Sequence, residues 1–232
     1  PRADPLFHRG GRMTADTIGL LIDIGAAAIL VTAFLIVSSR SLAFYLRLFA
    51  LQSLLLGGIA FLVVAAYGET HILIAAFLTV AVKAVAIPLV LGRIIERIGV
   101  RKEVDLSLNV TASLLVCGGI VIVADAVAHA VPGLGDSGAV PRVLSVSIAM
   151  MLIGLFIMTA RKQALTQIIG LLTMENGIFL SGLSMTYGMP MIVEVGIFFD
   201  ILVAVLILGV FVYRINRTFE TVSVDELRRL RH

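Results

Sequence analysis

The chain has 232 residues, 59% hydrophobic and 14% charged, and its formal net charge is +3. Soluble domains are usually about 45–50% apolar and about 25% charged, so this composition indicates an integral membrane protein. The single cysteine, Cys117, excludes an internal disulfide and an iron–sulfur cluster held by this chain alone. Zinc-type Cys/His spacing and Gly-rich phosphate loops are both missing from the sequence, so we expect no cofactor and no metal in this chain.

Residues 1–12 are polar and are expected to form an irregular extension, either an extended start or an added tag. A membrane domain is predicted over residues 13–213, followed by a tail over 214–232. A helix needs about 20 apolar residues to cross a bilayer. Seven stretches are long enough, at residues 17–37, 42–66, 71–95, 106–128, 142–160, 165–186 and 189–213. Small residues are expected to let these helices approach closely, namely Gly57, Gly58, Gly118, Gly119 and Gly182.

The placement of lysine and arginine predicts the orientation of these spans. The N-terminal segment and the gaps after the second, fourth and sixth spans carry four such residues, whereas the other gaps and the tail carry twelve. Positively charged loops stay on the cytoplasmic side, so we expect the N-terminus outside and the C-terminus in the cytoplasm. Membrane topology explains the basic tail, and no nucleic-acid partner is expected.

Three charged residues lie near the middle of separate spans: Lys83, Glu175 and Asp200. A charge at the bilayer centre costs roughly 2.5–3.5 kcal/mol on insertion scales, so such residues usually mark ion or proton paths. A rise of about 1.5 Å per residue places all three, with Gln52, about 15–18 Å from the start of their spans. The four residues are predicted to form one layer suited to lateral proton transfer.

The chemistry of this layer agrees with that prediction, because burial brings acids and amines closer to neutrality, where they exchange protons near pH 7. Pro88 follows Lys83 by five residues and removes a hydrogen bond to the Ala84 carbonyl, so the helix is expected to kink there. The alternative is a Lys83–Glu175 pair that only fixes helix packing, although three charges exceed what one pair requires.

Other polar positions give weaker signals. Glu194 lies about one turn into the last span and could be a proton portal or a solvated helix end. Asp125 and His129 are spaced i, i+4, so they could exchange protons with water or cap a helix at the interface. Asp23, in the outer third of the first span, is ambiguous.

Several segments of the sequence resemble a known family. The segments QIIG, LLTMENG and IVEVGIFFD within residues 167–200, VKAVAIPLV around Lys83, and the tail RINRTFETVSVDEL resemble component E of hydrogenase-4. The likeness extends from Met13 to the C-terminus. It implies a non-catalytic membrane subunit of a group 4 hydrogenase or formate hydrogenlyase-like complex, related to respiratory complex I.

Residues 142–213 also resemble the small three-helix subunit of complex I. Aligning that subunit's Ile-Gly motif with Ile169–Gly170 places its asparagine on Asn176 and its first membrane glutamate on Leu172. Glu175 is three residues further along, nearly one helical turn, so its carboxylate stays on roughly the same face. The second glutamate of that subunit matches Asp200 best.

The resemblance also implies partners and a location. The partners would be antiporter-like membrane subunits and hydrogenase-type peripheral subunits, which could carry nickel–iron and iron–sulfur centres. The location would be the cytoplasmic (inner) membrane of a bacterium or archaeon. Two alternatives stay open: a subunit of a Mrp-type cation/proton antiporter without redox partners, and a purely structural membrane adaptor.

Overall fold

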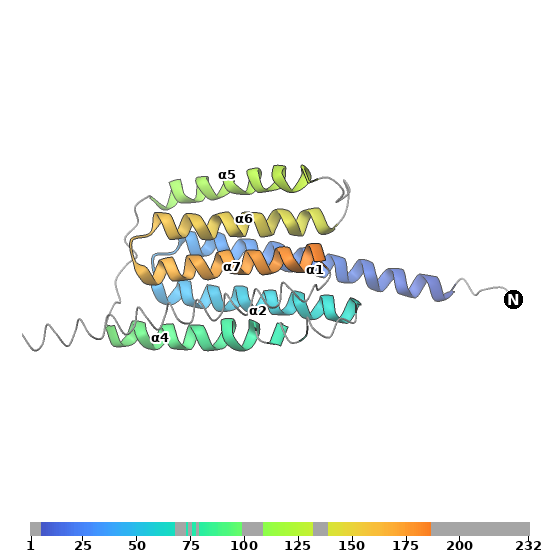
Figure 1. The fold of residues 1–232 in the computed structure, drawn as a ribbon, viewed down its shortest axis with the longest axis horizontal. Coiled ribbons are helices and arrows are strands. Elements are labelled where there is room, and N and C mark those ends of the chain that lie inside the picture. The colour runs from blue at the N-terminus through green and yellow to red at the C-terminus, as the bar shows by residue number, and fades with distance from the viewer. Residues whose placement is uncertain are drawn as a thin grey trace, which may run out of the picture.

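The structure is a computed structural model that describes residues 6–67, 73, 76–77, 79–98, 109–131 and 139–186, and all of its described elements are helical. In chain order they are α1 Leu6–Ser38, α2 Leu42–Tyr67, the π-helix η1 Thr79–Ala86, α4 Ile87–Ile98, α5 Val110–His129, α6 Ala139–Ala160 and α7 Ala164–Thr186. The helices run side by side along the long axis of the molecule (Figure 1).

Five of the described helices are long and apolar enough to cross a membrane: Thr17–Ser38, Leu42–Val64, Val110–His129, Val140–Ala160 and Ala164–Ser184. They correspond to the first, second, fourth, fifth and sixth predicted spans, so the all-helical membrane class is confirmed. The third span is only partly within the described residues. The seventh span lies outside them, together with Glu194, Asp200 and the tail. Seven spans with the N-terminus outside therefore stay a prediction.

The first helix begins earlier than the sequence suggested. Residues 1–12 were expected to be irregular, but α1 starts at Leu6, so that expectation is wrong for residues 6–12. Extending an existing helix costs far less than nucleating one, and no proline follows Pro5 in this stretch. The apolar span that starts near Thr17 therefore supports a helix that extends further toward the N-terminus.

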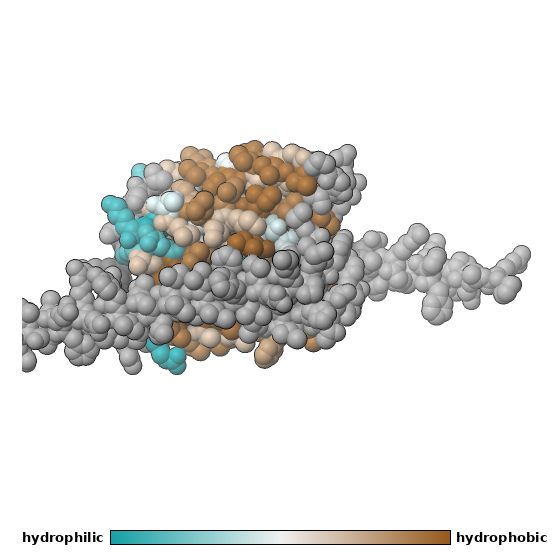
Figure 2. Space-filling view, in the orientation of Figure 1, coloured by the Kyte–Doolittle hydropathy of each residue, from teal (hydrophilic) through white to brown (hydrophobic). Residues whose placement is uncertain are grey.

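The centre of the bundle is formed by α6, which contacts α7, α5 and α1, while α2 contacts α1, α7, η1 and α4. Helix α5 lies at the edge of the bundle in Figure 1 and contacts only α6 and α1 extensively. Its outer face is apolar, since Leu115 is 73% exposed and Ile122 is 72% exposed. Figure 2 shows hydrophobic residues gathered over this part of the surface, as expected for a face in contact with lipid or another subunit.

Three glycines bring the backbones of α6 and α7 into direct contact. A Cβ atom on Gly154 would lie 2.5 Å from the backbone nitrogen of Met174, and one on Gly177 would lie 2.8 Å from the Ser147 carbonyl oxygen. A Cβ atom on Gly170 would lie 2.9 Å from the Gly154 oxygen. No larger residue fits at these three positions without displacing backbone, so these contacts fix the height of α7 against α6.

The structure confirms close helix packing at only some of the glycines predicted to mediate it. Gly57 does pack closely, because a Cβ atom there would collide with the side chain of Val80. Among the described residues, the expectation is wrong for Gly58, Gly118 and Gly119, because no atom lies within 4 Å of such a Cβ. Hydropathy does not distinguish a glycine facing a neighbouring helix from one facing outward, which is the physical reason for the error.

Candidate functional site

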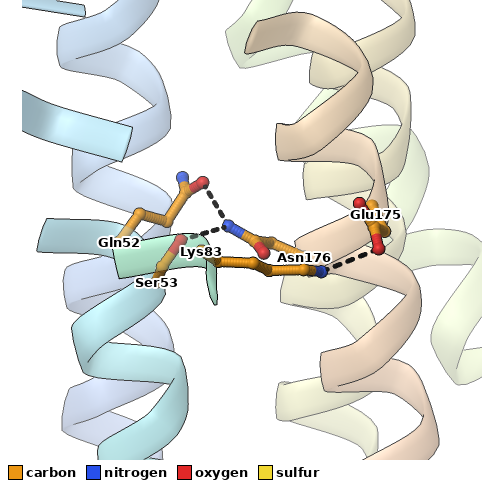
Figure 3. Close-up of polar contacts among 5 residues, drawn as sticks. All are labelled: Gln52, Ser53, Lys83, Glu175 and Asn176. Carbon is orange, nitrogen blue, oxygen red and sulfur yellow. Dashed lines mark hydrogen bonds and ion pairs between the residues drawn. The ribbon is translucent and has the colours of Figure 1, made fainter. Parts of the chain in front are cut away.

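Lys83 and Glu175 form a buried ion pair between η1 and α7. The Lys83 Nζ atom lies 2.9 Å from Glu175 Oε1, and the side chains are only 2% and 3% exposed (Figure 3). A charge in such a place is tolerated when it is paired, because desolvation of an isolated ion is very costly. Two of the residues predicted to form the midplane layer are thus in direct contact.

The lysine lies within an irregular stretch of helix. Residues Thr79–Ala86 form a π-helix, and the regular helix α4 begins at Ile87. Pro88 has no N–H group, so it donates to neither the Ala84 nor the Lys83 carbonyl. The structure thus has a π-helix directly before Pro88, and the kink expected there stays a prediction. Such segments are rare and often occur at functional sites.

A chain of neutral polar side chains begins beside the ion pair. Asn176, the residue after Glu175, donates from Nδ2 to Gln52 Oε1 at 3.0 Å and, more weakly, to Ser53 Oγ at 3.4 Å (Figure 3). All three of these side chains are at most 1% exposed. Helices α7 and α2 are therefore joined at the level of the ion pair.

The series of polar side chains continues from Gln52 across the bundle. Its Nε2 atom donates to Thr32 Oγ1 on α1 at 3.1 Å and lies 3.7 Å from the sulfur of Met150 on α6. Thr32 in turn donates to the carbonyl oxygen of Ile29 at 2.6 Å. Gln52 thus belongs to the same layer as the ion pair, as the depth estimate predicted, and contacts Glu175's neighbour. Its role in proton transfer stays a prediction.

Sequence reasoning did not include Asn176, Ser53 or Thr32 in the site. Neutral polar residues in a membrane helix usually bond to their own backbone, so their presence does not indicate contacts between helices. The one available signal was the family motif, in which Asn176 aligns with an asparagine of the related subunit. The predicted acids Asp200 and Glu194 lie outside the described residues.

A second polar group lies at one end of the bundle, on α1, α5 and α6. Arg142 donates to Asp23 Oδ2 from Nε at 3.1 Å and from Nη2 at 2.6 Å, which joins α6 to α1. Ser145 donates to Asp125 Oδ1 at 3.0 Å, and His129 Nδ1 lies 2.9 Å from the Asp125 carbonyl oxygen. Asp125 and His129 are both largely exposed, which agrees with their interpretation as an interface cap.

Arg161 lies at the opposite end of the bundle, in the turn between α6 and α7. It was counted among the charged residues of a cytoplasmic loop, but its side chain is only 2% exposed. Its Nη2 atom donates to the carbonyl oxygen of Val37 at 2.7 Å, in the last turn of α1. A cation at a helix C-terminus stabilises the carbonyl groups that lack partners there.

Within the described ranges no group of three His, Cys, Asp or Glu could hold a metal ion.

Comparisons with known proteins identify relatives over almost the whole chain. The family model described as NADH-ubiquinone/plastoquinone oxidoreductase chain 4L matches residues 142–232, a region that contains Glu175 and Asn176. An uncharacterized protein of Mycobacterium tuberculosis is 31% identical over 220 residues, which cover 94% of this chain and 100% of the relative. Hydrogenase-4 component E of Escherichia coli is 26% identical over 218 residues, or 93% of this chain and 99% of that protein. No solved structure matches the chain.

The chain belongs to the family of the Mycobacterium tuberculosis relative. Its matches to the chain 4L model and to hydrogenase-4 component E support a complex I-like membrane subunit. The resemblance drawn from the MEN and VEVGI motifs is thereby confirmed. Two of these matches, chain 4L and hydrogenase-4 component E, are components of oxidoreductase complexes, which supports a multi-pass membrane subunit of a multi-subunit complex. Among the described residues, the buried ion pair of Lys83 and Glu175 is the feature best suited to acid–base chemistry.

Proposed function

We propose that the chain is a membrane-arm subunit of a group 4 hydrogenase or formate hydrogenlyase-like complex and takes part in proton translocation. The observation that carries the proposal is the Lys83–Glu175 pair, with 2.9 Å between its charged atoms and almost no exposure to water. A bilayer subunit gains nothing in stability from such a pair that apolar side chains could not supply at lower cost. This cost favours a chemical role for the pair over a purely structural one.

The proposed chemistry uses the two charges in opposite roles. Glu175 binds and releases a proton, and the ammonium group of Lys83 stabilises its ionised form. Asp200, predicted at the same depth, provides the next acid, and Glu194 provides exchange with water near the outer surface. Redox reactions in peripheral subunits change the electrostatic field at these residues and so drive the proton. This chain itself carries out no redox step.

The test is neutralisation of the two predicted acids, Glu175→Gln with Asp200→Asn, in the intact complex. Proton uptake into inside-out membrane vesicles is measured with a pH-sensitive dye, using the electron donor that the purified complex oxidises. We expect uptake to fall at least about tenfold, a loss typical of removing an acid–base group. The matched control is Asp125→Asn, which neutralises a largely exposed acid at a helix end.

The outcome separates the three readings of the chain. Unchanged proton uptake at a normal level of assembled complex would mean that Glu175 and Asp200 do not carry protons. Loss of assembled complex without any defect per assembled molecule would indicate a structural adaptor. Purification in mild detergent identifies the parent complex: nickel–iron and iron–sulfur subunits would support the hydrogenase proposal, and antiporter subunits alone would support a Mrp-type complex.

A further inference from the structure

Hydrogen bonds link Asn176, Gln52, Thr32 and the Ile29 carbonyl in series. The Ile29 carbonyl at the end of this series determines which atom donates in each bond. The carbonyl oxygen of Ile29 can only accept, so the single hydroxyl hydrogen of Thr32 points to it, at 2.6 Å. Thr32 Oγ1 must then accept from Gln52, which requires the amide nitrogen Nε2 to lie on that side, at 3.1 Å. The opposite atom of the amide, Oε1, consequently faces Asn176.

The same reasoning fixes the orientation of Asn176. Gln52 Oε1 needs a donor, so the atom of Asn176 that lies 3.0 Å from it is the nitrogen Nδ2. The carbonyl oxygen Oδ1 is then directed away from Gln52. It is buried, and it has no hydrogen-bond partner in the part of the chain that the structure describes. An unpaired buried acceptor is costly, which suggests that a donor reaches it in another state of the protein.

The ammonium group of Lys83 is a candidate donor, because it lies 2.9 Å from the carboxylate of Glu175, the residue before Asn176. Asn176 follows Glu175 directly on α7, and Figure 3 shows both residues on the side of α7 from which Lys83 approaches. An ammonium group has three hydrogens to donate and sits at the end of a flexible four-carbon side chain. It contacts Glu175 while that carboxylate is ionised, at 2.9 Å.

We propose that Asn176 Oδ1 accepts a hydrogen bond from the Lys83 ammonium group in the state where Glu175 carries a proton. This inference rests on the proposed function, in which Glu175 binds and releases protons. An incoming proton forms an O–H bond on the Glu175 carboxylate, and no electrons are transferred. Lys83 keeps its three hydrogens and moves one hydrogen bond from Glu175 Oε1 to Asn176 Oδ1. Asn176 is thus a positioning residue for Lys83.

Two substitutions at position 176 separate this role from a structural one. Both Asn176→Leu and Asn176→Asp remove the Nδ2 donor to Gln52. Asn176→Leu also removes the acceptor, whereas Asn176→Asp keeps an acceptor and gives it a negative charge. The matched control is Thr173→Val, a buried position on α7 whose hydroxyl donates only to the Ile169 carbonyl, at 2.8 Å.

The measurement is the pH dependence of proton uptake by the intact complex in inside-out vesicles. We expect the pH of half-maximal uptake to fall by about one unit in Asn176→Leu and to rise by about one unit in Asn176→Asp, a tenfold change in proton affinity in each direction. Thr173→Val should keep the wild-type profile. Shifts of opposite sign cannot come from the shared loss of the Gln52 hydrogen bond.

The outcomes distinguish this inference from the proposed function. If Glu175→Gln abolishes uptake while both Asn176 variants keep the wild-type pH profile, the alternative acceptor is wrong and the proposed function stands. If Glu175→Gln leaves uptake unchanged, the proposed function itself is wrong. Should Asn176→Leu fail to assemble, Asn176→Asp alone decides, because an unshifted profile in that variant overturns the role of Asn176.

Discussion

The buried ion pair makes a quantitative prediction about coupling between two residues. Lys83→Met removes the cation and keeps most of the side-chain volume, and Glu175→Gln removes the anion and keeps the shape. Together with the double variant they form a double-mutant cycle. Each single variant leaves a charge of the pair at a site that is only 2% or 3% exposed, without the partner that lay 2.9 Å away.

The expected magnitude follows from that burial. Removing one partner of a buried pair costs about 3–5 kcal/mol, whereas replacing both charges by neutral groups is often close to neutral. The two single costs should therefore fail to add, with a coupling energy of about 3 kcal/mol or more. The Asp23–Arg142 pair is the matched control, since its side chains are 21% and 63% exposed. Its coupling, measured with Asp23→Asn and Arg142→Met, should stay below about 1 kcal/mol.

The assay is an SDS titration of the purified protein in mild detergent, with the folded fraction followed by circular dichroism. The free energy of unfolding of wild type, both single variants and the double variant gives the coupling energy directly. Additive costs at Lys83 and Glu175, within about 0.5 kcal/mol, would refute the reasoning. Equal coupling in the buried and the exposed pair would refute it as well, because burial would then have no effect on the strength of the interaction.

Two further substitutions test how the bundle is assembled, with the same titration as the measurement. Gly154→Ala should lower the free energy of unfolding by about 1–3 kcal/mol, because a Cβ there would lie 2.5 Å from the Met174 nitrogen. Gly119→Ala, with no atom within 4 Å, should be neutral, and equal effects would contradict the packing. Arg161→Met should cost about 1.5–3 kcal/mol, because the Val37 carbonyl loses a charged donor at 2.7 Å; a neutral result would show that this contact is unimportant.

The membrane spans could be predicted because the bilayer itself imposes their length. Five stretches that were found by counting apolar residues are described as helices within a few residues of the expected bounds. Helix packing could not be predicted in the same way. Gly154 and Gly118 look alike in the sequence, yet only Gly154 faces the backbone of another helix. That distinction depends on which face of each helix meets a neighbour, and highly apolar helices show little periodicity in their sequences.

The charged part of the site could be predicted because charge in a membrane is expensive. Lys83 and Glu175 were identified by that cost alone, and the structure joins them. The neutral part could not be found, because Asn176 and Thr32 cost little and are common in membrane helices. Arg161 lies in the gap between helices where the charge count placed it, but the count could not show that its long side chain is buried against the Val37 carbonyl.

The chemistry of the polar chain limits where a proton at Glu175 can go. Asn176, Gln52 and Thr32 have no group that takes up or releases protons near neutral pH. Their hydrogen bonds run in one direction and end at the Ile29 carbonyl, which accepts only. The hydrogen bonds on this side of the site join α7 to α2 and α1 beside the ion pair, and a part for Gln52 in proton transfer stays a prediction. Asp200 is the next acid that the sequence predicts at the same depth.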